Sequence, residues 1–154
     1  MLIENEFQVE APADEVYALM LDVERVATCM PGCEVLGQRG DGGYDGRMSV
    51  KLGPMKMKYE GSVAITDRDA AARTAVMLAK GVEARGQGSA QGTLTMSVAD
   101  AGSAADVTVA TDIKLTGRVA QMGQGIMRDV ATKMVAEMAT NMERLLEPSE
   151  GHAA

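Results

Sequence analysis

The sequence predicts an α+β protein in which a curved antiparallel sheet of about seven strands wraps around a long C-terminal helix, with two short helices after the first strand. Two observations carry this prediction. Apolar and polar residues alternate along most of residues 3–115, which is typical of strands with one buried face. Over residues 127–145 the apolar residues recur every three or four positions, as in an amphipathic helix. A sheet with one apolar face needs a cover, and this helix offers a matching apolar stripe.

The N-terminal region predicts one strand followed by two short helices. Residues 3–9 alternate between apolar and polar side chains, so we expect a half-buried strand there. Pro12 is typical of a helix start, and Asp22 is a suitable cap for a second helix. That helix must end before Pro31, because proline disfavours a helical residue before it.

The middle of the chain predicts a series of antiparallel strands. Residues 44–52 and 55–65 alternate cleanly on either side of Gly53 and Pro54, which indicates a hairpin. The alternation over residues 74–84 is too weak to show which side faces the helix. Further strands are expected from near Cys33, over this same segment 74–84, and at residues 90–98 and 107–115, with turns at residues 67–73 and 99–106.

The last predicted element is a helix from near Gly123 to Glu147, roughly 35 Å long. Pro148 ends it, so we expect one domain over residues 1–147 and a disordered tail over residues 148–154.

Composition excludes several functional classes. The 154 residues include 22 acidic and 15 basic side chains, and the resulting net charge of −7 argues against nucleic-acid binding. No apolar run is long enough to span a bilayer, and the acidic, alternating N-terminus does not resemble a signal peptide. With two cysteines, a reducing cytoplasmic location is the expectation.

Residues with catalytic or metal-binding chemistry do not form a convincing site. Cys29 and Cys33 bracket a Pro-Gly turn and offer at most half of a zinc or iron–sulfur site, and the only histidine is His152. The glycines at 86–88 and 122–127 lack the βαβ setting of a dinucleotide site. We therefore expect no catalytic residue and no metal.

Methionine is unusually frequent. The chain has 13 Met but one Phe, three Tyr and no Trp. Methionine fills irregular apolar spaces and also lines pliable binding surfaces, so ordinary core packing and an apolar ligand pocket are both open interpretations. The small residues on the predicted inward positions favour unfilled volume, and an unfilled apolar volume can bind a ligand.

Four motifs together resemble a known family. They are MPG at residues 30–32, KLGP at 51–54, ARGQG at 84–88 and GRVAQMGQG at 117–125. With these motifs the chain resembles the CoxG family of carbon monoxide dehydrogenase subunits, a branch of the START-like helix-grip (SRPBCC) superfamily, over about residues 1–147.

The resemblance implies a non-catalytic role. Members are encoded with carbon monoxide dehydrogenase-type molybdenum hydroxylases or with hydrogenases. They are associated with recruiting the oxidising enzyme to the inner face of the cytoplasmic membrane and with carrying a respiratory quinone, menaquinone or ubiquinone. Longer members carry an apolar C-terminal tail, whereas the residues EPSEGHAA are polar, so the expected membrane contact is peripheral. The alternatives are a ligand-free recruitment or assembly factor for the dehydrogenase and, more remotely, an enzyme of the cyclase or hydrolase kind.

A quinone bound in this fold would lie between the long helix and the sheet. The expected cavity residues are Tyr44, Met48, Val50, Met57, Tyr59, Met96, Val109, Ile113, Met127, Val130, Met134 and Met138. Arg118 and Gln121 are expected at the cavity mouth, near the polar head of the ligand.

Overall fold

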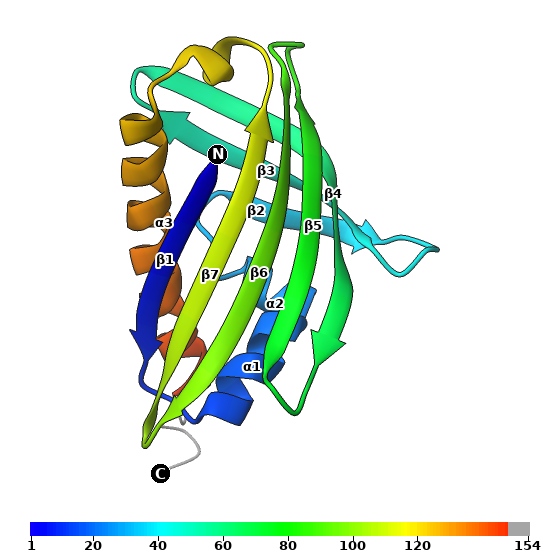
Figure 1. Cartoon of the computed structure of the whole chain (residues 1–154). Helices are drawn as coiled ribbons and strands as arrows, with labels where there is room; N and C mark the ends of the chain where they lie inside the picture. The colour runs from blue at the N-terminus through cyan, green and yellow to red at the C-terminus, as the bar shows by residue number, and fades with distance from the viewer. Residues whose placement is uncertain (148–154) are drawn as a thin grey trace.

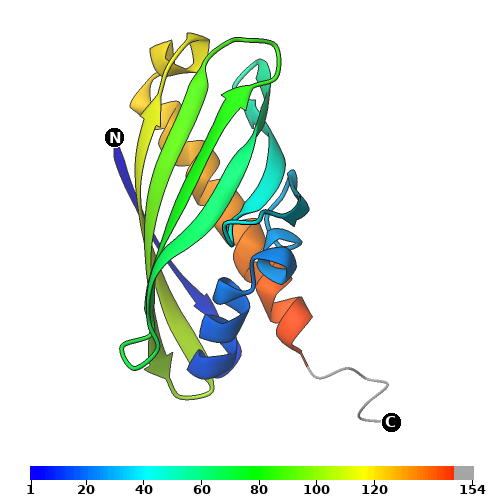
Figure 2. The same cartoon turned by 90° about the vertical axis from the view of Figure 1, so that its right-hand side faces the viewer.

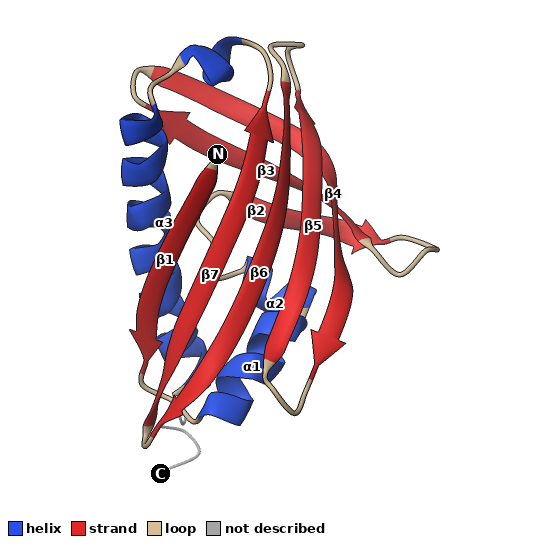
Figure 3. Cartoon of the chain, in the orientation of Figure 1, coloured by secondary structure: helices blue, strands red, loops and turns tan. Residues whose placement is uncertain are grey.

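The computed structural model describes residues 1–147, so the expected tail at 148–154 lies outside the described residues. Figures 1 and 3 show a strongly bent sheet with helices on one side. In chain order the elements are β1 (Leu2–Val9), α1 (Ala13–Leu21), α2 (Val23–Ala27), β2 (Cys33–Gln38), β3 (Tyr44–Leu52), β4 (Met55–Asp69), β5 (Thr74–Glu83), β6 (Ser89–Ala101), β7 (Ala104–Leu115), the 3-10 helix η1 (Arg118–Gln121) and α3 (Gln124–Leu146).

The strands form a single seven-stranded sheet in the order β1-β7-β6-β5-β4-β3-β2, and every neighbouring pair is antiparallel. The sheet curves around α3, which crosses its concave side (Figure 2). The helix makes its main contacts with β1, β3 and α1. The predicted fold class is confirmed.

Alternation along the strands separates an inner face, toward α3, from an outer face. In β3, Met48 and Val50 are half-buried and Leu52 is buried, whereas Ser49 and Lys51 between them are exposed. The pairing register assigns the face of β5 that the sequence left open. Ala75 lies opposite the buried Met96 of β6, so Ala75, Met77 and Ala79 face inward.

The short helices begin and end as their sequence predicts. Pro12 precedes the first residue of α1, and the Asp22 side chain accepts a hydrogen bond of 3.3 Å from the backbone N–H of Arg25 at the start of α2. After α2, the backbone N–H of Cys33 donates to the carbonyl of Met30 at 3.2 Å. This bond closes the turn through Pro31 and Gly32.

Two predicted turns are shorter than expected. Strand β4 continues to Asp69, so the turn expected over 67–73 contracts to 70–73 and includes Arg73 at φ 52°. Strands β6 and β7 leave only residues 102–103 between them instead of a turn over 99–106. Both predictions were wrong in extent, because cross-strand pairing continues to the ends of these long hairpins.

The β3–β4, β5–β6 and β7–η1 loops meet at one end of the sheet, which we call the η1 end (top of Figure 1). The backbone N–H of Arg118 donates to the carbonyl of Gln87 at 3.2 Å. Gly88 and Gly117 both have positive φ and pack so closely that a Cβ on either would overlap the opposing backbone. The opposite end, with α1 and the β4–β5 and β6–β7 turns, is called the α1 end.

Candidate ligand-binding site

Buried apolar residues inside the fold form two separate clusters, one toward each end of α3. The η1 cluster consists of Ile3, Leu52, Met57, Val119 and Met127. The larger α1 cluster joins α1 to the sheet and to the end of α3. Its buried members are Val9, Ala11, Ala13, Val16, Tyr17, Leu19, Met20, Cys29, Ala75, Met96, Val98, Ala105, Val107, Val109, Met138 and Met142.

A band of half-buried residues lies between the clusters. We define this central belt as Tyr44, Met48, Val63, Ala79 and Met134, none of which belongs to either cluster. The four strand residues point to the inner face, and Met134 lies on α3 between the methionines of the two clusters. Inner-face residues of a well-packed covered sheet are normally buried. Their partial exposure therefore indicates incomplete packing between α3 and the middle of the sheet.

Small residues predominate on the inner face beside the belt. Two adjacent rows run across the inner face, and most of their positions lack a large side chain. At Gly61 the neighbouring strand is so close that a Cβ would overlap the carbonyl of Lys80, so the sheet can bend sharply here. The first row is Gly46, Gly61, Gly81 and Ala90, and the second is Tyr44, Val63, Ala79 and Gly92.

The belt has a polar corner at Tyr59 and Glu83. Tyr59 of β4 lies directly between Met48 of β3 and Glu83 of β5 in the pairing register. The Tyr59 hydroxyl is buried and has no hydrogen-bond partner among the described residues. Burial, together with the charge of Glu83, raises the pKa of Tyr59.

Glu83 is 3% exposed and its carboxylate is already hydrogen-bonded. One oxygen accepts the backbone N–H of Lys58 at 3.1 Å, and the other accepts that of Arg85 at 2.7 Å. These backbone hydrogen bonds, led by the one from Lys58, hold the pKa of Glu83 below its usual value. The carboxylate is therefore ionised at neutral pH and fixes the β5–β6 turn.

The predicted cavity residues divide among the two clusters and the belt. Tyr44, Met48 and Met134 lie in the belt. Met57 and Met127 are buried in the η1 cluster, against which Val50, Tyr59, Ile113 and Val130 pack, and Met96, Val109 and Met138 are buried in the α1 cluster. Arg118 and Gln121 are exposed on η1 at the end of the fold. Their contact with a ligand stays a prediction.

Several residues of the site were not identified from the sequence. Val63, Ala79 and Gly81 enter the site through cross-strand pairing with β3 and β6. Glu83 was missed because a charged residue at a strand end normally faces water. Its only signal was the weak alternation of residues 74–84, which left the inner face of this strand open.

Two surface hollows lie outside the belt. One, of about 320 Å³, is lined by residues of α2 and β2 that include Cys33 and Leu36. The other, of about 430 Å³, covers the outer side of the glycine row and is bordered by charged residues such as Arg39 and Lys80. Neither of these two hollows lies between α3 and the inner face of the sheet.

The two cysteines belong to the turn after α2 and help to fix it through their backbone groups. Cys29 and Cys33 are free thiols, and burial raises the pKa of both, which favours the protonated form that binds metals poorly. The Asn141 side chain of α3 donates to the carbonyl of Cys29 at 2.9 Å and ties the turn to the helix. Within residues 1–147, no three His, Cys, Asp or Glu side chains gather as a metal site would require.

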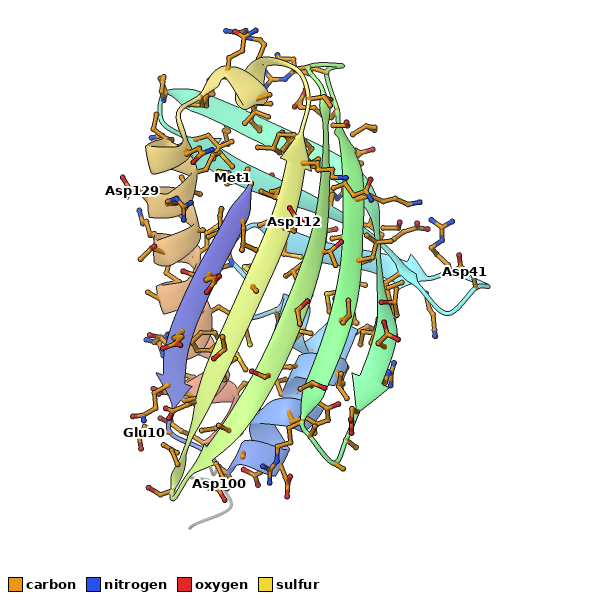
Figure 4. The ribbon with its side chains drawn as sticks, in the orientation of Figure 1. Met1, Glu10, Asp41, Asp100, Asp112 and Asp129 are labelled. Carbon is orange, nitrogen blue, oxygen red and sulfur yellow. The ribbon has the colours of Figure 1, made fainter. Side chains whose placement is uncertain are left out.

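The charged side chains differ between the two ends of the fold. The α1 end carries acidic side chains such as Glu10 and Asp100 (Figure 4), together with Arg73, which pairs with Asp14 at 2.8 Å. The β3–β4 turn, the β5–β6 turn and η1 at the η1 end carry several exposed lysines and arginines, while Asp129 of α3 is acidic (Figure 4). We define the basic surface as Lys51, Lys56, Lys58, Arg85, Lys114, Arg118 and Arg128. Among the described residues, the Arg85 contact with Glu83 at 3.8 Å is the only ion pair of this surface.

Comparison with known families identifies the chain. The model of the carbon monoxide dehydrogenase CoxG subunit family matches residues 6–147. The chain belongs to the CoxG family. No curated protein is similar enough in sequence to count as a match for this CoxG-family chain.

Solved structures share the fold of this CoxG-family protein at low sequence identity. A conserved protein from Geobacillus kaustophilus has a TM-score of 0.83 and 18% identity, over 95% of each chain. The Zhui aromatase/cyclase from Streptomyces sp. R1128 has a TM-score of 0.58 and 15% identity, over 95% of this chain and 90% of that one. A START superfamily protein from Mycobacterium smegmatis has a TM-score of 0.59 and 13% identity, over 94% and 96%. These likenesses establish the START-like helix-grip fold.

Neither α3 nor any other helix within residues 1–147 combines the length and the hydropathy that crossing a bilayer requires.

Proposed function

We propose that this protein binds a lipophilic, quinone-like molecule in the central belt and carries it, without catalysing a reaction, between the cytoplasmic membrane and a carbon monoxide dehydrogenase-type molybdenum hydroxylase or a hydrogenase. The observation that carries this proposal is the half-buried belt between two buried clusters. The CoxG family and the START-like fold support a hydrophobic ligand and a link to carbon monoxide dehydrogenase.

The belt suits a long apolar molecule with a flat ring. Met48 and Met134 face the site from β3 and α3, and thioether side chains adapt to varied apolar shapes. Glycine and alanine on the neighbouring inner positions provide little side-chain volume, so a bound chain can lie close to the sheet backbone.

The polar groups near the belt support binding in preference to acid–base catalysis. The Glu83 carboxylate is occupied by backbone N–H groups, and burial raises the pKa of Tyr59, so the hydroxyl stays protonated and can donate a hydrogen bond to a ligand. A general base needs a free basic atom within reach of the substrate, and the Glu83 carboxylate has structural partners instead.

The basic surface supports a peripheral contact with an anionic membrane. Lys51 and Lys56 lie directly opposite each other across β3 and β4, where like charges destabilise a sheet. Exposed apolar residues lie among these charges, namely Pro54 at the β3–β4 turn and Ile126, which is 39% exposed, near the start of α3. Basic residues around small apolar protrusions favour the headgroup region of anionic bilayers.

Ligand binding is tested by titrating the purified protein, loaded with the neutral dye Nile red, with decylubiquinone. We expect saturable displacement of the dye, and mass spectrometry of an organic extract of the protein as purified should reveal a prenylated quinone or a similar lipid. The absence of both an extractable lipid and saturable displacement would overturn the carrier proposal.

Membrane contact is tested by co-sedimentation with vesicles of phosphatidylcholine alone or with phosphatidylglycerol. We expect binding only to the anionic vesicles, reduced by the double substitution Lys51→Glu and Lys56→Glu and by added salt. Lys80→Glu is the matched control, because Lys80 lies on the outer face of β5 away from the basic surface. Equal binding to both kinds of vesicle would contradict this part of the proposal.

A ligand-free recruitment factor is the second candidate function. It is favoured by the position of both surface hollows outside the belt. In that case the dehydrogenase would be retained on the immobilised protein equally well after Met134→Phe, while decylubiquinone would bind neither form.

A further inference from the structure

The most unusual polar group of the interior is the hydroxyl of Tyr59. It is the one buried side-chain oxygen or nitrogen without a hydrogen-bond partner in the part of the chain that the structure describes. Buried hydroxyls are nearly always paired, because leaving one unpaired is unfavourable. An unpaired buried donor on the inner face of a binding fold therefore points to a missing acceptor.

Glu83 is the cross-strand neighbour of Tyr59, but it does not form a hydrogen bond with the Tyr59 hydroxyl. Both carboxylate oxygens point to backbone N–H groups, at 3.1 Å from the nitrogen of Lys58 and 2.7 Å from that of Arg85. The Arg85 guanidinium is a further 3.8 Å contact of the same carboxylate. Glu83 thus contributes a fixed negative charge next to Tyr59 while the hydroxyl proton remains free to donate.

We infer that Tyr59 and Glu83 form a head-group subsite that selects a neutral hydrogen-bond acceptor, such as a ring carbonyl, over a carboxylate. The inference rests on the proposed function, because it assumes that a lipophilic ligand enters the belt. A carbonyl oxygen accepts the Tyr59 proton and carries no net charge. A fatty-acid carboxylate would lie beside the Glu83 carboxylate in a region of low dielectric, where like charges repel strongly.

The surroundings of Tyr59 suit a ring attached to a chain. Met48 is directly opposite on β3 and is half-buried, whereas Met57, two residues along β4 on the same face, is fully buried. In the proposed complex, the flexible Met48 side chain moves aside so that the ligand reaches Tyr59 from the belt. A ring carbonyl then reaches Tyr59 while its chain continues toward Met134.

The experiment compares three probes that carry the same ten-carbon chain. Decylubiquinone has neutral carbonyl acceptors, undecanoate has a carboxylate, and decylbenzene has neither. Each displaces Nile red from the wild-type protein and from Tyr59→Phe. We expect decylubiquinone to bind the wild type about tenfold more tightly than either other probe, since one hydrogen bond to a buried group is worth about that factor.

Tyr59→Phe should weaken decylubiquinone about tenfold and leave decylbenzene unchanged. Its urea unfolding midpoint should be equal to that of the wild type or higher, because an unpaired hydroxyl has been removed. Tyr17→Phe is the matched control. It breaks the hydrogen bond to Thr74, so it should lower the unfolding midpoint and leave the preference among the probes intact.

Two outcomes would overturn the inference in different ways. If the wild type binds the probes without preference, or if Tyr59→Phe binds decylubiquinone as well as the wild type does, the subsite is wrong and the carrier function stands. If no probe displaces Nile red from the wild type, the proposed function falls and the subsite falls with it.

Discussion

Replacing methionine by phenylalanine at two positions of α3 tests whether the belt is open. Met142 is fully buried in the α1 cluster, whereas Met134 is half-buried in the belt. Phenylalanine is bulkier and stiffer than methionine, and forcing such a side chain into a packed site costs about 1–3 kcal/mol. We therefore expect Met142→Phe to lower the free energy of unfolding by about that amount. Met134→Phe should change it by less than about 0.5 kcal/mol, since its ring extends into unfilled space.

The assay is urea unfolding of both variants, followed by circular dichroism. With a denaturant slope of about 1–3 kcal/mol per M for a small domain, Met142→Phe should lower the midpoint by about 1 M, and Met134→Phe should leave it within about 0.3 M. Both substitutions lie on the same helix, so helix propensity changes equally. Equal destabilisation at the two positions would mean that the interior is packed throughout, and the reasoning from partial exposure would be refuted.

Three further predictions concern the bend of the sheet, the basic surface and the buried carboxylate. Gly61→Ala should destabilise the protein by about 2–4 kcal/mol because its Cβ overlaps a backbone carbonyl, while Gly37→Ala, with open space around it, should change stability by under about 0.5 kcal/mol in the same urea assay. Lys51→Glu should raise the free energy of unfolding by about 0.2–1 kcal/mol at low salt by pairing with Lys56, and a loss of stability would argue against like-charge repulsion there. Because folding lowers the pKa of Glu83, the contribution of its carboxylate to stability is complete above the ordinary pKa of 4.5 and is lost as the pH falls toward the folded-state pKa. Urea unfolding midpoints measured down to about pH 3 should therefore fall less steeply in Glu83→Gln than in the wild type. Parallel curves for the two proteins would contradict this assignment.

The faces of the sheet could be predicted wherever apolar and polar residues alternate. Met48, Val50 and Met57 were placed inward for this reason, and the structure confirms their orientation. The face of β5 could not be predicted because Val76, Leu78 and Val82 put apolar residues on its outer side as well. Val82 is 61% exposed. Only the pairing of β5 with β4 and β6 determines which residues of β5 reach the belt.

The belt itself depends on relations that no single segment contains. The glycines of β3, β4 and β5 each look like an isolated strand glycine in the sequence, and their alignment in one row follows from the register of two hairpins. Likewise, the sequence placed Tyr59 near a ligand but could not show that its hydroxyl is unpaired. That follows from the structure, in which the carboxylate of the neighbouring Glu83 binds the backbone N–H groups of Lys58 and Arg85 instead. The pairing of strands that are distant in the sequence brings the site residues together, whereas the local sequence pattern shows only which residue types face inward.

The most direct test of ligand binding in the belt is NMR of protein carrying carbon-13 in its methionine methyl groups. The 13 methionines report on both clusters, the belt and the surface in one spectrum. On titration with decylubiquinone, we expect the largest shift changes at Met48 and Met134, with Met20 and Met142 of the α1 cluster nearly unchanged. Shifts confined to methionines outside the belt, or no saturable shift at Met48 and Met134, would contradict the account.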